Sequence, residues 1–196
     1  MNYLAHIYLS GIDTERRIGG FIADAVKGSD LTHFPDKIAQ GIVLHREIDY
    51  FTDTHPLVKE LTKELRNRFG RYAVILPDIY FDHLLTRHFD EYSRQSLRRF
   101  AHGFYLSLLT HYPILPPRIK RFMWHFILTN RLCRYKSTAG LRESLMIMES
   151  YHRIVMDVEG AVRYLEENLP QIDKLFTIFF SELRSAVQTW QQDISY

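Results

Sequence analysis

Two short stretches of this chain place carboxylates and imidazoles at helical spacing among apolar residues. In the first, Asp78 and Asp82 are one helical turn apart, and His83 lies about 100° around the helix from them. In the second, His45 and Asp49 have the i,i+4 spacing, at which one side chain can orient the other or both can bind one ion. Charged groups on apolar helices are costly to bury unless they are paired or metal-bound. Both stretches are therefore candidate parts of a metal site, with an exposed His–Asp stripe as the alternative for the second.

Two isolated polar residues occur in other apolar stretches. Asp24 follows Phe21-Ile22-Ala23, and we expect this carboxylate to be buried against a metal ion or a cation. His6 is flanked by apolar residues on nearly every side of a short helix. A lone histidine of this kind is more often a hydrogen-bonded core residue than a ligand, and both interpretations of His6 stay open.

The residue types limit the chemistry of any metal site. With ten histidines and one cysteine, Cys133, the ligands must be imidazole and carboxylate, which suits Mn, Fe, Mg or Zn in a catalytic role. Such a metal lowers the pKa of a bound water and neutralises charge on a phosphoryl oxygen. Arg46, beside His45, has the planar fork that binds phosphate oxygens. A single cysteine also favours a reducing location, and we expect the protein to be cytoplasmic.

The periodicity of apolar residues predicts one all-α domain over residues 1–196. Alternating strand patterns are hard to find, and no apolar run reaches the ~18 residues that a membrane span needs. Prolines, glycines and capping residues bound the expected helices. These helices are residues 1–9, Thr14 to Gly28, Pro35 to beyond Asp49, and those that follow Pro56, Pro77 and Ser93, then 118–133, 138–152, 159–168 and 171–190.

Charge is unevenly distributed along the chain. The first 91 residues carry a balance of −3, and the residues from Glu143 onward carry −5. Between them, Tyr92 to Arg142 holds ten basic residues and no acidic one. This tract predicts a basic face for an acidic partner, unless its arginines pair with carboxylates from the flanking segments.

Four motifs together resemble the acyl carrier protein phosphodiesterase family, also called ACP hydrolyase: Met1-Asn-Tyr-Leu-Ala-His6, Gly20-Phe-Ile-Ala-Asp24, residues 41–53, and Asp78-Ile-Tyr-Phe-Asp82-His83. The resemblance covers roughly the first half of the chain. It implies an all-helical, HD-like fold and removal of the 4'-phosphopantetheine arm from holo-acyl carrier protein. It also implies a manganese-dependent activity, with Mg²⁺, Fe²⁺ or Co²⁺ as alternatives. The His-Asp dipeptide of ordinary HD phosphohydrolases is absent, and the reversed Asp82-His83 stands instead.

On this resemblance, the expected metal ligands are Asp24, His45, Asp82 and His83, and the expected proton-transfer and phosphate-binding groups are His6, Arg46, Asp49 and Asp78. The expected partner is the acidic acyl carrier protein, without nucleic acid or membrane. The residues expected to bind it are Arg118, Lys120, Arg121, Arg131, Arg134 and Lys136.

Two other hypotheses compete with this one. The same metal site in an HD-like phosphohydrolase could act on a nucleotide or another small phosphoester. Alternatively, the chain is a non-enzymatic helical module whose cationic face binds an acidic partner, which predicts no bound transition metal.

Overall fold

The computed structural model describes residues 1–152 and 156–193, and the backbone within these ranges is helical with connecting turns and no strand. The expectation of an all-α chain is therefore confirmed. The helices are α1 (Tyr3–Leu9), α2 (Thr14–Ile22), η1 (Ala23–Ala25), α3 (Asp36–Thr54), α4 (Pro56–Phe69), η2 (Gly70–Val74), α5 (Leu76–Arg87), α6 (Phe89–Tyr92), α7 (Leu97–Thr110), η3 (Tyr112–Ile114), α8 (Pro117–Leu128), α9 (Arg131–Arg134), α10 (Thr138–His152), α11 (Val158–Glu167) and α12 (Leu169–Asp193).

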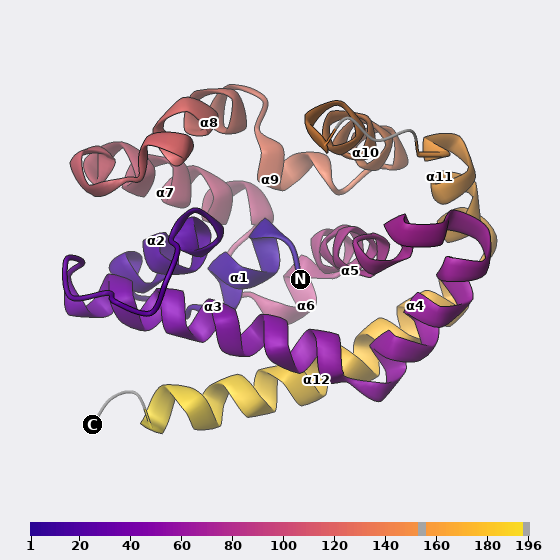
Figure 1. The fold of residues 1–196 in the computed structure, drawn as a ribbon, viewed down its shortest axis with the longest axis horizontal. Helices are drawn as coiled ribbons and strands as arrows, with labels where there is room; N and C mark the ends of the chain where they lie inside the picture. Colours follow the sequence, from indigo (N-terminus) through magenta and orange to yellow (C-terminus); the bar gives the residue numbers. More distant parts are fainter. Residues whose placement is uncertain (153–155, 194–196) are drawn as a thin grey trace.

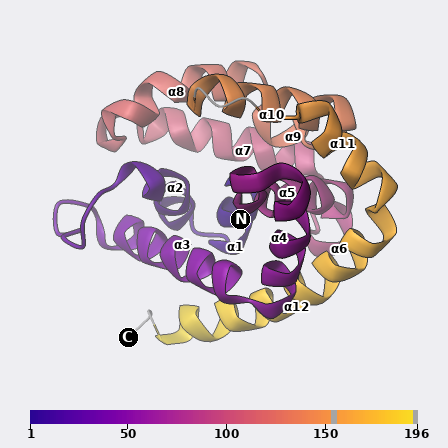
Figure 2. The same ribbon diagram turned by 45° about the vertical axis from the view of Figure 1, so that its right-hand side comes forward.

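The short helix α1 lies at the centre of the molecule, where it contacts α2 and α5 (Figure 1). The long helix α12 runs beside α3 on one side of α1, and α8 to α10 lie on the opposite side (Figures 1 and 2). α1 can occupy this position because Leu4, Ala5 and Ile7 are all fully buried. The aromatic residues of α12 at helical spacing, Phe176, Phe179 and Phe180, are likewise buried, as their spacing predicts.

Two glycines bring α2 and α3 into direct backbone contact. A Cβ added to Gly19 would lie 2.1 Å from the carbonyl oxygen of Ile38, and one added to Gly41 would lie 2.2 Å from that of Arg16. Neither neighbour is a flexible side chain, so only glycine permits this separation. The contact places the end of α2 next to the middle of α3, where His45 lies.

Two expected helix boundaries are corrected. Asp13, rather than Thr14, caps α2, and α2 gives way to the 3₁₀ segment η1 after Ile22 instead of running to Gly28. The helix expected over residues 118–133 is interrupted after Leu128, because Asn130 adopts a left-handed conformation with φ of 47°. α9 therefore begins in a new direction at Arg131. Within the described residues, no helix has the length and apolarity that crossing a membrane requires.

Candidate metal centre

Two imidazoles and a carboxylate converge between α1 and α3. The rings of His6 and His45 stack with their centroids 3.7 Å apart. His6 Nε2 lies 3.1 Å from Asp49 Oδ1, and His45 Nε2 lies 3.0 Å from Asp49 Oδ2. One ligand atom from each of the three residues falls within 4.8 Å of the others, a spacing that one metal ion can bridge. The i,i+4 pairing of His45 with Asp49 is confirmed.

The orientation of His45 is that of a metal ligand. Its Nδ1 lies 2.7 Å from the carbonyl oxygen of Gly20, which can only accept, so Nδ1 carries a proton and donates it. Nε2 is buried and has no hydrogen-bond partner, although Asp49 and Asp24 oxygens lie 3.0 and 3.3 Å away. A backbone acceptor that fixes the tautomer and leaves the second nitrogen free is the usual support of a metal-binding histidine.

His6 has a different environment. Its Nε2 lies 3.0 Å from the carbonyl oxygen of Met1, so this nitrogen donates, while its buried Nδ1 has no hydrogen-bond partner. His6 can present the Nε2 lone pair to an ion when its proton moves to Nδ1. The residues present thus fit a divalent ion with imidazole and carboxylate ligands.

The pKa values of His6 and His45 are shifted in opposite directions. Burial lowers the pKa of His45, but the adjacent carboxylates of Asp24 and Asp49 outweigh it and raise this pKa to about 9. Burial and the charge of His45 lower the pKa of His6 to about 4. The pKa of Asp49 is held well below its usual range, because the two imidazoles and the Met1 amino group oppose the effect of burial. The Asp24 and Asp49 carboxylates therefore favour a positive charge between them, and in the metal-free protein the protonated His45 ring supplies it.

Asp24 and Asp78, two further expected site residues, lie at the edge of this cluster, whereas Arg46 is held by the loop after η1. Asp24 is not buried as expected: its side chain is 70% exposed, because η1 turns it to the rim of the site, where it still lies 3.3 Å from His45 Nε2. Asp78 accepts a 2.8 Å hydrogen bond from the Met1 amino group. Arg46 is tied to the loop after η1, where it donates to the carbonyl oxygens of Val26 and Gly28.

Asp82 and His83 form hydrogen bonds with backbone groups of other segments and not with the cluster. Asp82 is fully buried, and its two oxygens accept hydrogen bonds from the backbone N–H groups of Leu4 (2.8 Å) and Ala5 (3.2 Å). These are N–H groups of the first turn of α1, which have no partner inside that helix. Burial raises the pKa of Asp82 to about 7, although these two hydrogen bonds oppose it. His83 Nδ1 donates to the carbonyl oxygen of Tyr135, away from His6 and His45.

The basic residues of the tract from Tyr92 to Arg142 differ in whether a carboxylate neutralises them. Arg134 pairs with Glu143, and Arg142 pairs with Glu159, so these two cations are neutralised from the following segment. Lys120 donates to the carbonyl oxygen of Pro113. Arg118, Arg121, Arg131 and Lys136 form no ion pair with any residue that the structure describes.

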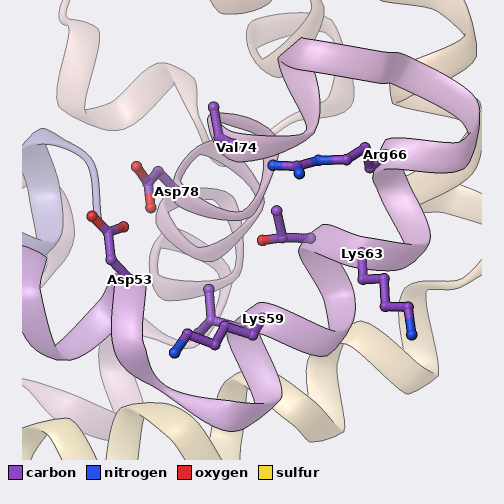
Figure 3. A pocket seen from close by; sticks show the side chains of 8 residues that line it. Asp53, Lys59, Lys63, Arg66, Val74 and Asp78 are labelled. Carbon is purple, nitrogen blue, oxygen red and sulfur yellow. The ribbon is translucent and has the colours of Figure 1, made fainter.

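Two cavities are both lined by Asp78, whose partner, the Met1 amino group, lies 3.7 Å from Asp49. One, of about 430 Å³, is also lined by Asp24, Arg118 and Arg131. The other, of about 410 Å³, lies between α3, α4 and α5. Figure 3 shows Asp53 and Asp78 on one side of this second cavity, and α4 supplies the cations that line it: Lys59, Lys63 and Arg66.

Three backbone groups contact side chains of the site without any signal in the sequence. The carbonyl of Gly20 orients His45, and the amino and carbonyl groups of Met1 contact Asp78 and His6. Such contacts carry no side-chain pattern, so the sequence offers no direct signal for them. The i,i+4 spacing of His45 and Asp49 was the signal for their contact within α3.

Imidazoles and carboxylates that converge from separate helices beside a cavity form the kind of centre that metal-dependent hydrolases use. The family model described as acyl carrier protein phosphodiesterase matches residues 1–183, and the chain belongs to this family.

The curated relatives agree with the family assignment. The chain is 29% identical to the acyl carrier protein phosphodiesterase of Yersinia enterocolitica, over 97% of this chain and all of that protein. It is 30% identical to that of Photorhabdus laumondii, over 92% of this chain and 91% of the relative. A Salmonella newport protein of the same name is 34% identical over 63% of this chain and 66% of its own. No solved structure matches the chain.

Proposed function

We propose that this protein is an acyl carrier protein phosphodiesterase that hydrolyses the phosphodiester between 4'-phosphopantetheine and the carrier-protein serine. The products are apo-acyl carrier protein and 4'-phosphopantetheine. The family membership supports the substrate, and the convergence of His6, His45 and Asp49 supports a metal-dependent mechanism.

The ligand set that we propose follows the geometry rather than the resemblance alone. His45, Asp49 and His6 hold the divalent ion, and Asp24 closes the set from the rim. Asp82 stays outside it, because both of its oxygens accept hydrogen bonds from backbone N–H groups of α1. His83 stays outside it, because the ligand atoms that lie within reach of one ion among the described residues belong to His6, His45 and Asp49. Manganese is the proposed native metal, since these oxygen and imidazole ligands suit it.

Each group has a task in hydrolysis. A divalent ion held by His6, His45, Asp49 and Asp24 would supply a water of lowered pKa and would neutralise charge on the phosphoryl group. The Gly20 carbonyl holds the His45 ring in place, and Asp49 fixes both imidazoles relative to each other. Asp78 holds the Met1 amino group at the edge of the cluster.

The test is an assay of the metal-free protein with holo-acyl carrier protein, to which Mn²⁺, Mg²⁺, Fe²⁺ or Co²⁺ is added back. We expect the carrier protein to lose the mass of its arm only when a metal is present. Apo-acyl carrier protein formed at the same rate in excess chelator would contradict the metal dependence. No apo-protein with any of the four metals would contradict the function itself.

A further inference from the structure

The 430 Å³ cavity is lined by residues from the start of α1, from α2 and η1, from α5 and from α8 to α10. Its size is within the range of small-ligand sites. Much of its wall is apolar, with Tyr3, Phe21, Ile79 and Phe122 among the lining residues. It is lined by Asp24, which lies 3.3 Å from His45 Nε2, so the cavity borders the proposed metal centre.

Arg131 lines this cavity and is unusual for an arginine. It is only 5% exposed, and its Nε is buried without a hydrogen-bond partner. No carboxylate of the described residues forms an ion pair with it, and its guanidinium carbon lies 5.8 Å from the ring centroid of Tyr135. A buried cation without a counter-charge is destabilising, and an anionic ligand in the cavity would supply that charge.

A second guanidinium faces the same space. Arg118, from the first turn of α8, also lines the cavity and forms no ion pair with a described residue. By contrast, Arg134 and Arg142 of the same basic tract are neutralised by glutamates. The two arginines of this tract that reach the cavity are thus both available to an anion.

We propose that Arg131, assisted by Arg118, is an anion-binding residue that holds the phosphate of the substrate arm inside this cavity. The apolar wall takes the uncharged remainder of the arm. The ligand class is a phosphate ester that carries a short, partly apolar chain. This inference rests on the proposed function, but its tests are binding and stability rather than turnover.

Binding of 4'-phosphopantetheine to the metal-free protein, measured by calorimetry in chelator, tests Arg131 directly. In Arg131→Met we expect the affinity to fall about ten- to a hundred-fold, the usual effect of losing a charge-assisted hydrogen bond. Pantetheine, which lacks the phosphate, should bind wild type and variant equally. Arg163→Met, at an exposed arginine of α11 outside the cavity and the basic tract, is the matched control and should bind 4'-phosphopantetheine as wild type does.

The melting temperature gives a second measurement. Because Arg131 lacks a counter-charge, Arg131→Met should melt at the same temperature as wild type or higher without ligand. Added 4'-phosphopantetheine should raise the melting temperature of wild type and not that of the variant. Arg131→Lys keeps a cation without the fork, so it should show an intermediate shift.

The outcomes separate the two proposals. Equal affinity of wild type and Arg131→Met for 4'-phosphopantetheine, or a ligand-free variant that melts well below wild type, would overturn the role of Arg131. Wild type that releases the arm from the carrier protein in the same experiment would leave the phosphodiesterase function standing. Phosphate-dependent binding at Arg131 without any turnover would uphold this site and reject that function.

Discussion

Asp49 is the residue on which the proposed metal centre depends most, since its two oxygens contact both imidazoles. In Asp49→Asn we expect bound manganese to be lost and kcat/KM to fall about 100-fold or more, because the amide removes the ligand charge. Stability of the metal-free protein should fall as well, because the Asp49 carboxylate, whose pKa is held well below its usual range, stabilises the charged His45 beside it. Metal analysis and the carrier-protein assay measure the two effects.

The matched control for this change lies one helical turn further along α3. Asp53 is exposed and lines the second cavity, so Asp53→Asn should keep the metal and the activity. A metal-free Asp53→Asn, or an Asp49→Asn protein with full metal content, would reject the ligand set proposed for the cluster.

We expect Asp82 to be needed for stability and not for metal binding. Asp82→Ala removes the acceptor of two backbone N–H groups of α1, so we expect it to lower the free energy of unfolding by about 3 kcal/mol. The folded variant should still bind metal at low temperature. Urea unfolding and metal analysis test this, with the exposed Asp90→Ala as control. Unchanged stability together with loss of the metal would return Asp82 to the ligand set.

At the scale of helices, the contact of α2 with α3 positions Asp24 and the Gly20 carbonyl against His45. Gly19→Ala would place a methyl group against the backbone of α3, so we expect the free energy of unfolding to fall by about 1–3 kcal/mol. Activity should fall as well, because α3 must shift. Urea unfolding and the carrier-protein assay provide the measurements.

Gly103, on α7, is the internal comparison, because a Cβ there would meet nothing within 4 Å. Gly103→Ala should stabilise the protein by about 0.5–1 kcal/mol through reduced chain entropy. Equal effects of the two substitutions would show that the α2–α3 contact does not require glycine.

A second contact between helices, made by His88, should contribute to stability in a pH-dependent way. His88, at the end of α5, lies 2.8 Å from Glu91 and 2.7 Å from Asp173 of α12. Burial lowers the pKa of His88, but these two carboxylates outweigh it and raise it above 6.5. The charged imidazole therefore stabilises the fold below about pH 6.5, and this contribution is lost as pH rises through the folded-state pKa.

Melting temperatures of wild type and His88→Gln across pH 5 to 9 measure this contribution. We expect the difference between the two proteins to be largest at acidic pH and to shrink as pH rises. A difference that grows toward high pH would contradict the assigned ion pairs.

For the molecule as a whole, the basic tract is the proposed dock for the acidic carrier protein. Arg121→Glu with Lys136→Glu should raise KM for holo-acyl carrier protein about tenfold at low salt, since both side chains are exposed and unpaired within the described residues. kcat should stay unchanged. The effect should weaken as salt is added.

Lys174→Glu provides the comparison, because it reverses an exposed charge on α12, on the side opposite α8 (Figure 1). It should leave KM unchanged. Equal effects from both sets would indicate a general charge effect, and no effect from Arg121 and Lys136 would favour a small phosphoester as substrate.

The sequence by itself determined the helical class, the family and the His45–Asp49 pair within α3. Apolar periodicity and the i,i+4 spacing of His45 and Asp49 are local properties of one helix, so they can be read without a fold. The tertiary structure decided the rest. His6 joins the pair because the packing of α1 against α2 and α5 brings its ring onto that of His45. Asp82, which has the same spacing to Asp78, turns inward to the backbone of α1. Which side of a helix faces another element depends on packing between segments far apart in sequence, and no local spacing encodes that choice.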